Sequence, residues 1–224
     1  SGAADVELCD RRLLARIHRY TIDRLRSEIE PVSAQDFMRF LFERHQLTKQ
    51  ARAGGRAGLR DAIGLLQGFE IAASAWETSV LPARVAGYRS EWLDELCLSG
   101  EVAWARLSPR QTSPNNVAGP SRATPIAIVQ RADLDWLLDA VRGGLEPEVA
   151  SFDATLAVLE SLRARGALFF HDLQSRTKLA RPELVEALWD LIGRGVATAD
   201  GFQPLRDLYA PPRYATTGMR PAQG

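Results

Sequence analysis

Apolar and polar residues alternate at helical spacing from the start of the chain. Between residues 7 and 29, leucines and isoleucines recur with arginines between them, a pattern that predicts an amphipathic helix of about six turns. Glu30-Pro31 ends this helix, because the residue before a proline is disfavoured in helical backbone. Ser33 then stands at the N-cap of a second predicted helix. We therefore expect an N-terminal helical segment over residues 1–54.

A helix, a turn, a second helix and a strand follow one another between residues 66 and 107. The strand, residues 101–107, has its predicted partner at residues 125–130. The loop between them is polar, rich in turn residues and free of acidic residues. Two helices followed by a hairpin are typical of a winged helix, whose helix and wing reach a common surface. The pattern predicts a first winged-helix unit over residues 55–142, with a long wing at 108–123.

The same order of elements returns in the last third of the chain. Three helices are predicted between residues 152 and 193, with short strands at 167–170 and 195–198. We interpret this as a degenerate duplication, which makes the fold class mainly α with small β-wings (α+β), in tandem winged-helix units. The remaining predicted boundaries are a linker at 143–150, a second winged-helix unit at 151–209 and a disordered tail at 210–224.

Charge alone does not draw the chain to a polyanion. Lys plus Arg and Asp plus Glu number 28 each, so any contact with nucleic acid must come from local patches. Three patches stand out: a loop-rich neighbourhood, the turn between the two helices of the first unit, and the acid-free wing. The candidate nucleic-acid-binding residues are Arg44, Lys49, Arg52, Arg56, Arg60, Arg84, Arg89, Arg110 and Arg122. For each of them the alternative is a solvated position on a surface of mixed charge.

The helices in the recognition position are acidic. They carry Glu91, Asp94 and Glu95 in the first unit, and Glu183, Glu186 and Asp190 in the second. Phosphates would be repelled by such faces, so neither helix is expected to enter a major groove. We expect binding through wings and loops, without sequence specificity, and contact of the acidic faces with protein instead.

The five tryptophans are expected to play two roles. Trp76, Trp92, Trp136 and Trp189 lie on apolar helical faces and are predicted to be in the core. Trp104, on the strand, is a candidate platform for stacking with a base.

Several classes of chemistry lack their motifs. The chain has no GxxxxGK[ST] phosphate loop, no GxGxxG after a strand and no GxSxG elbow. His18, His45 and His171 show no ligand spacing, so neither a metal nor a cofactor is expected in this chain. Cys9 and Cys97 form no disulfide framework, which fits the cytoplasm. No apolar run approaches the roughly 20 residues that span a bilayer, so no membrane contact is expected.

Four segments carry a resemblance to a known family. They read DRRLLARIHRYTIDRLRSEIEPVSAQDFMRFLF, LQGFEIAASAWETSVLPARVAGYRSEWLDELCLSGEVAWARL, TPIAIV and LRARGALFFHDL. In order and wording they resemble the last domain of the core of Lhr, the large helicase-related bacterial superfamily 2 proteins. The resemblance covers nearly the whole chain apart from the wing loop and the tail.

That resemblance implies an ATP-dependent 3′-to-5′ DNA helicase and translocase that acts in DNA repair. ATP and magnesium would be held by motor domains upstream, so this chain alone is expected neither to hydrolyse ATP nor to unwind DNA. Its implied role is that of an accessory domain. It would contact single-stranded DNA, or an RNA:DNA hybrid, and pack on the motor domains of the same protein.

A second resemblance points to an alternative function. The run from Gln67 to Tyr88 is similar to the start of AlkZ-type DNA glycosylases, where a Gln-x-Asp or Gln-x-Gln pair attends the excised base. Here Phe69 stands where the second polar residue would be, and Glu70 falls on the opposite face of an extended strand. A glycosylase-like module acting on damaged bases is therefore the alternative. A purely structural or protein-interaction brace is the third possibility.

Overall fold

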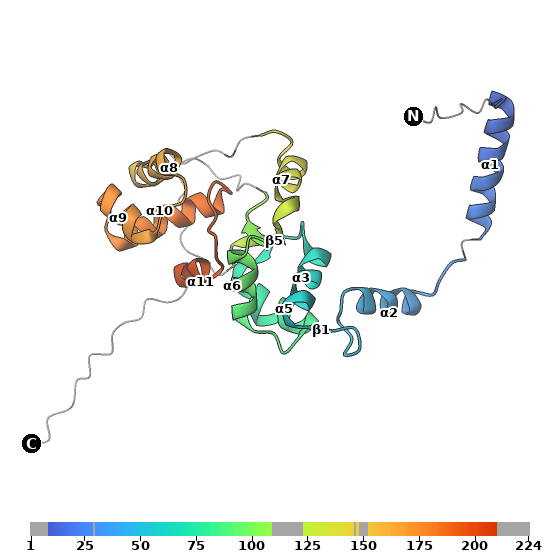
Figure 1. Ribbon diagram of the computed structural model, residues 1–224, viewed down its shortest axis with the longest axis horizontal. Helices are drawn as coiled ribbons and strands as arrows, with labels where there is room; N and C mark the ends of the chain where they lie inside the picture. The colour runs from blue at the N-terminus through green and yellow to red at the C-terminus, as the bar shows by residue number, and fades with distance from the viewer. Residues whose placement is uncertain (1–8, 29, 109–122, 146, 148–151, 210–224) are drawn as a thin grey trace, which may run out of the picture. The chain divides into compact units, whose positions relative to one another are not determined.

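The computed structural model describes residues 9–28, 30–108, 123–145, 147 and 152–209 (Figure 1). By its internal contacts the chain forms two compact units, residues 1–42 and 43–224. This division differs from the predicted boundaries, because the two halves of the second unit share a hydrophobic core. The predicted wing interior, half of the predicted linker and the predicted tail lie outside the described residues.

The N-terminal part holds two helices, α1 (Arg11–Ser27) and α2 (Ala34–Arg44). The side chain of Asp10 caps α1 by accepting hydrogen bonds from the first backbone amides. Ser33 caps α2 as predicted, because its Oγ accepts a hydrogen bond from the backbone N–H of Asp36 at 3.1 Å. Neither helix has a buried residue, so the apolar side of each amphipathic helix remains exposed.

The first winged-helix segment begins with β1 and ends with α7. Its elements are β1 (Ala53–Gly54), α3 (Gly55–Leu66), β2 (Ile71–Ala72), α4 (Ala73–Ala75), a π-helix (Trp76–Val80), α5 (Leu81–Arg84), β3 (Val85–Ala86), α6 (Ser90–Leu98), β4 (Val102–Ala105), β5 (Pro125–Gln130), a 3₁₀ turn (Arg131–Asp133) and α7 (Leu134–Arg142). The predicted hairpin is confirmed, since β4 and β5 pair antiparallel from Val102–Gln130 to Ala105–Ala127. Strand β2 pairs with the other edge of β5, which gives the order β2-β5-β4.

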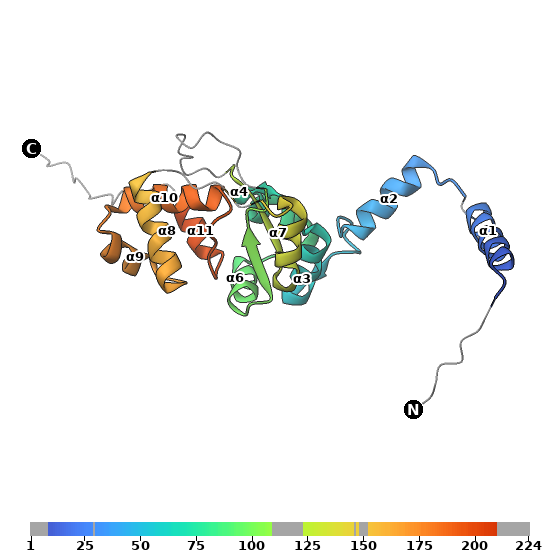
Figure 2. The same ribbon diagram turned by 90° about the horizontal axis from the view of Figure 1, so that it is seen from above.

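The hairpin is buried on both faces. Figure 2 shows a strand of this unit between α6 and α7. On one face, Trp104, Ile126 and Ile128 pack with α3 and α6 in the main core. On the other face, Ala127 and Val129 pack against Leu137 of α7. The hairpin therefore packs into a hydrophobic core on each of its two faces.

Two tryptophan predictions are wrong. Trp104 is not a stacking platform: it is fully buried, and its indole Nε1 donates to the backbone oxygen of Gly201 at 2.9 Å. Its ring also meets Phe202 edge to face, with centroids 6.5 Å apart. Trp136, predicted in the core, is 53% exposed and donates its indole N–H to Asp133. Trp136 lies on a helix as predicted, but the face of α7 that packs on the hairpin is the one that carries Leu137.

In the last third of the chain, each regular element among the described residues is a helix. It contains α8 (Asp153–Arg165), α9 (Phe170–Thr177), α10 (Arg181–Gly193) and α11 (Gln203–Tyr209). The predicted fold class, mainly α with a few short strands, is thus confirmed for the chain. The strands predicted at 167–170 and 195–198 are wrong, since neither segment forms one.

The physical reason lies at the end of α10. The backbone amides of Val196 and Ala197 both donate to the oxygen of Leu191, so the chain turns back onto its own helix. Thr198 then donates its hydroxyl to the oxygen of Trp104, on the open edge of β4. The segment predicted to form a second wing instead covers the edge of the first hairpin.

One acidic residue of α10 was also misplaced. Asp190 was predicted on the polar face, yet it is 1% exposed. Its carboxylate accepts two hydrogen bonds from Nε of Arg194, both at 2.9 Å. A buried carboxylate is tolerated here because a buried guanidinium one turn later compensates its charge.

Candidate nucleic-acid interface

The exposed arginines of α3 are paired with carboxylates. Arg56 lies 3.1 Å from Glu101 and 3.6 Å from Glu95, and Arg60 lies 3.6 Å from the other oxygen of Glu101. The structure therefore brings these two predicted residues together around one carboxylate. Each of these side chains is more than a third exposed, so the pairs contribute little to stability.

The two arginines predicted to flank the inter-helix turn have different roles. Arg84 is partly buried, donates from Nη1 to the oxygen of Val80 at 2.9 Å, and has a pKa lowered by burial. Its guanidinium therefore satisfies a backbone carbonyl one helical turn earlier. Arg89 is exposed and lies 3.5 Å from Glu91, whose pKa is lowered first by a backbone hydrogen bond and further by Arg89.

The segment before α3 carries exposed basic charge. Arg44, Lys49 and Arg52 are exposed, and within the described part of the chain none of the three takes part in an ion pair. This set is called the 44–52 surface below. Arg110 and Arg122, the two predicted wing residues, lie outside the described residues.

The acidic face of α6 is largely neutralised. Each of its three acids has a basic partner: Arg89 for Glu91, Arg56 for Glu95, and Arg206 for Asp94 at 2.7 Å. The predicted bare negative face is therefore a set of ion pairs. Because these ion pairs reduce the repulsion of phosphate on which it rested, the exclusion of this helix from a groove stays a prediction.

Arg206, on α11, is a residue that sequence reasoning missed. Its Nε and Nη2 contact both oxygens of Glu77 at 2.6 and 2.9 Å, and its Nη1 contacts Asp94. Burial lowers the pKa of Arg206, but the hydrogen bonds from Glu77 and Asp94 outweigh it and raise the pKa above its usual value. Tyr88 donates to the same Glu77 at 2.7 Å. No local spacing signals this cluster, because its members lie up to 129 residues apart.

Two more arginines hold the base of the wing. Glu70 accepts hydrogen bonds from the backbone amides of Leu107 and Ser108, and its carboxylate lies 3.7 Å from Nε of Arg106. Arg142 donates to the oxygens of Leu107 and Gly195. Arg106 also donates from Nη1 to the oxygen of Pro125 at 3.2 Å, so both strands of the hairpin are anchored near the point where the described residues stop.

Gln67 has a polar partner that its own segment does not supply. Its Nε2 donates to Oδ2 of Asp133 at 2.8 Å, and its Oε1 accepts from the backbone of Gln130 at 3.3 Å. The other oxygen of Asp133 accepts from Trp136 at 3.0 Å. The hydrogen bond from Trp136, followed by that from Gln67, lowers the pKa of Asp133, so the carboxylate is ionised at neutral pH. The sequence pattern could not reveal this pair, whose members are 66 residues apart.

No group of three or more metal-ligating side chains occurs among the residues that the structure describes. In the same part of the chain, every helix is too short or too polar to cross a bilayer.

Comparisons with known proteins agree with this architecture. Residues 32–121 match the family model of the winged-helix domain of large helicase-related protein. A Lhr helicase and probable uracil glycosylase of Mycolicibacterium smegmatis is 34% identical over 217 residues, which cover 94% of this chain and 13% of that protein. A Lhr helicase and uracil glycosylase of Escherichia coli is 29% identical over 224 residues, which cover 92% of this chain and 14% of that protein. The chain therefore spans a small part of the length of these relatives.

Proposed function

The chain carries a winged-helix domain of the large helicase-related (Lhr) family, and from that premise we propose that it contacts single-stranded DNA without sequence specificity. In this proposal it is the accessory domain of an ATP-dependent 3′-to-5′ helicase that acts in DNA repair. ATP and magnesium are used by the motor domains of that protein, on which this chain packs. An RNA:DNA hybrid presents the same phosphate backbone and is a second substrate.

The 44–52 surface is the observation that carries the proposal. Exposed cations without a carboxylate partner are free to replace the counterions of a phosphate backbone. The arginines of α3 are less available to phosphate, because each already has a carboxylate partner. Contacts of this kind position a strand and read no bases.

The apolar sides of α1 and α2 support packing on another domain. Exposed large apolar side chains include Leu14, Ile17 and Tyr20 on α1, and Phe37 and Phe40 on α2. Apolar surface of this extent on amphipathic helices is typical of a protein interface. We propose that the motor domains of the same protein cover it.

Titration with a fluorescent oligonucleotide tests the DNA contact. We expect weak binding to a single strand that is independent of base sequence and steeply weakened by salt. Substituting the 44–52 surface (R44Q, K49Q and R52Q together) should lower the salt slope by about 2, at roughly 0.7 for each phosphate contact.

The matched control removes the same charge from paired positions. R56Q, R60Q and R89Q together should change the slope less, because each wild-type side chain already has a carboxylate partner. Absence of binding at about 50 mM salt, or equal losses in the two triple variants, would contradict the proposal.

A second candidate function is supported by the Gln67–Asp133 pair. The carboxylate is ionised and held by two donors, and both relatives are named as helicases with a uracil glycosylase or probable uracil glycosylase activity. In such a reaction the base leaves with the electrons of the N-glycosidic bond, and an ionised carboxylate stabilises the cationic sugar. Water then adds to the sugar carbon and gives its proton to that carboxylate.

A uracil-containing single strand, treated with alkali after incubation, tests this candidate. Strand scission with wild type, and its loss in both D133N and Q67A, would support it. D135N is the control, since Asp135 is an exposed carboxylate two residues later, in α7. Intact strands with the wild-type chain would exclude the candidate without affecting the DNA-binding proposal.

A further inference from the structure

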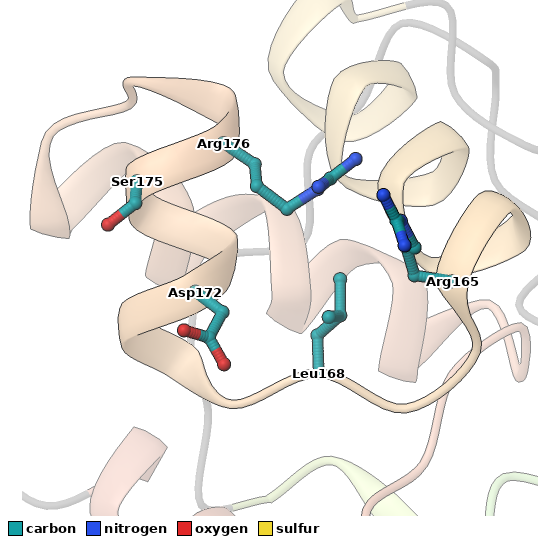
Figure 3. Close-up of a pocket in the computed structure, with 5 residues that line it drawn as sticks. All are labelled: Arg165, Leu168, Asp172, Ser175 and Arg176. Carbon is teal, nitrogen blue, oxygen red and sulfur yellow. The ribbon is translucent and has the colours of Figure 1, made fainter.

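A pocket opens between α8 and α9, far along the chain from the 44–52 surface. It has a volume of about 290 Å³ and is lined by Arg165, Leu168, Asp172, Ser175 and Arg176 (Figure 3). We propose that this pocket binds a backbone phosphate of single-stranded nucleic acid, while a neighbouring base stacks on Phe169. The inference rests on the proposed DNA-binding function and adds a second, independent contact to it.

The two guanidinium groups make the pocket an anion site. Figure 3 shows the side chains of Arg165, from the end of α8, and Arg176, from the end of α9, directed toward one another across the pocket. Both residues are exposed, and in the described part of the chain neither forms an ion pair. Two like charges facing each other repel, and an anion between them converts that repulsion into two attractions.

The chemistry of the lining suits a phosphate. Each guanidinium presents parallel N–H donors that match two oxygens of a phosphate, and Ser175 adds a hydroxyl donor. Among the described lining residues the acid is Asp172, and Figure 3 shows its carboxylate directed away from both guanidinium groups. It lies 3.8 Å from Nδ1 of His171 instead. The positive side of the pocket is therefore uncompensated.

Phe169 indicates a nucleic acid strand rather than a free phosphate. It follows the lining residue Leu168 in sequence and its side chain is 83% exposed, directly before α9, while the next ring, Phe170, is covered by the guanidinium of Arg181 at 4.9 Å. Exposed aromatic rings combined with cationic grooves hold unpaired bases without reading their sequence. A duplex would not offer its bases for such stacking, so the pocket fits a single strand.

The test compares salt-dependent binding of an oligo-dT strand by the whole chain and by R165Q/R176Q. Loss of two phosphate contacts should lower the salt slope by about 1.4 and weaken binding about 25-fold at about 0.1 M salt. The charge-matched control is R24Q/R39Q, since Arg24 and Arg39 are exposed and each is paired on its own helix. F169A should weaken binding about fivefold or more, and that loss should vanish on a strand of abasic spacers.

Each outcome decides between the two proposals. Weakening in both R165Q/R176Q and the triple variant of the 44–52 surface supports both. Weakening in R165Q/R176Q alone supports this pocket and overturns the 44–52 surface. If only the triple variant weakens binding, or if R24Q/R39Q does as much as R165Q/R176Q, this pocket is overturned and the function stands. A wild-type chain that binds an acidic peptide but no oligonucleotide overturns both.

Discussion

The two helix-turn-helix segments of the chain close their cores in different ways. In residues 55–142 the helices pack on a hairpin, and both the helices and the strands contribute fully buried side chains. In residues 152–193 the core is a small cluster of aliphatic residues between α8, α9 and α10. The first segment supplies its own β-structure, whereas the second sends its last residues to the first.

That exchange explains why similar patterns give different structures. Phe202 and Leu205, which follow the second helical segment, are fully buried in the core of the first. Trp189 and Ile192 join them from the end of α10. A strand needs a partner with free backbone groups, and the edge of β4 that it could pair with is instead covered by a segment whose Thr198 hydroxyl donates to the oxygen of Trp104. The second segment is therefore expected to depend on the first for its stability.

The largest expected effect comes from the buried pair in α10. D190A leaves the guanidinium of Arg194 buried without its carboxylate, which should cost about 3–5 kcal/mol of unfolding free energy in urea. The control, E186A, removes an acid of the same helix that is not fully buried and should change stability by no more than about 0.5 kcal/mol. Because the two segments share a core, one cooperative transition is expected. Two separate transitions would show that the segments are independent.

The next effect concerns the ion pairs of Arg206, on α11, with Glu77 and Asp94 of the first segment, which we call the clamp. R206A removes the partner of Glu77 and Asp94, and we expect a loss of about 3 kcal/mol, near the lower limit for a buried pair. R24A, which breaks an exposed pair on α1, should cost no more than about 0.5 kcal/mol. Equal losses in thermal unfolding would mean that the clamp does not join the segments.

Local order was more predictable than the contacts between distant elements. The hairpin, the cap at Ser33 and the helices of both segments follow from periodicity and turn residues, because those signals act within a few residues. Trp104 and Trp136 were assigned the wrong environments, since a helical or strand period marks a face without saying what covers it.

In the candidate sites too, the sequence showed the residues but not their distant partners. Positions of arginines were visible in the sequence, but their partners were not: the carboxylate that neutralises Arg56 is 45 residues away. The same holds for Gln67 and Asp133. Pairing decides whether a cation is available to phosphate, so the 44–52 surface could be distinguished from the paired arginines of α3 only in the structure.

A smaller effect is expected where the two segments touch at Gly195. Its φ is +73°, and a Cβ there would lie 2.6 Å from Nη2 of Arg142 and 2.7 Å from the oxygen of Arg106. G195A should therefore cost about 2 kcal/mol or more, from left-handed strain together with overpacking. G143A is the control, since Gly143 has a φ of +58° with open space around it, and should cost about 1 kcal/mol. Similar losses in urea titration would indicate that the approach at Gly195 relaxes without strain.

The smallest effect is expected for the reactivity of the Cys97 thiol, which lies in the core of the first segment. Burial raises the pKa of the Cys97 thiol to about 12, so at about pH 8 it is protonated and shielded, whereas Cys9 is exposed. A thiol reagent should therefore modify one cysteine per native chain and two after unfolding.

The same shift fixes the direction of the pH dependence. The unfolded thiol ionises near its ordinary pKa of 9.0 and the folded thiol only near 12, so the folded state holds more protons between these values. The free energy of unfolding should be unaffected by Cys97 below about pH 8 and should fall as the pH rises above about 9, and C97A should remove that part of the slope.

In D190A, Cys97 reports whether the segments open together: its modification rate at about pH 8 should rise with global unfolding. An unchanged rate alongside a melted α10 would show that the first segment holds its core without the second.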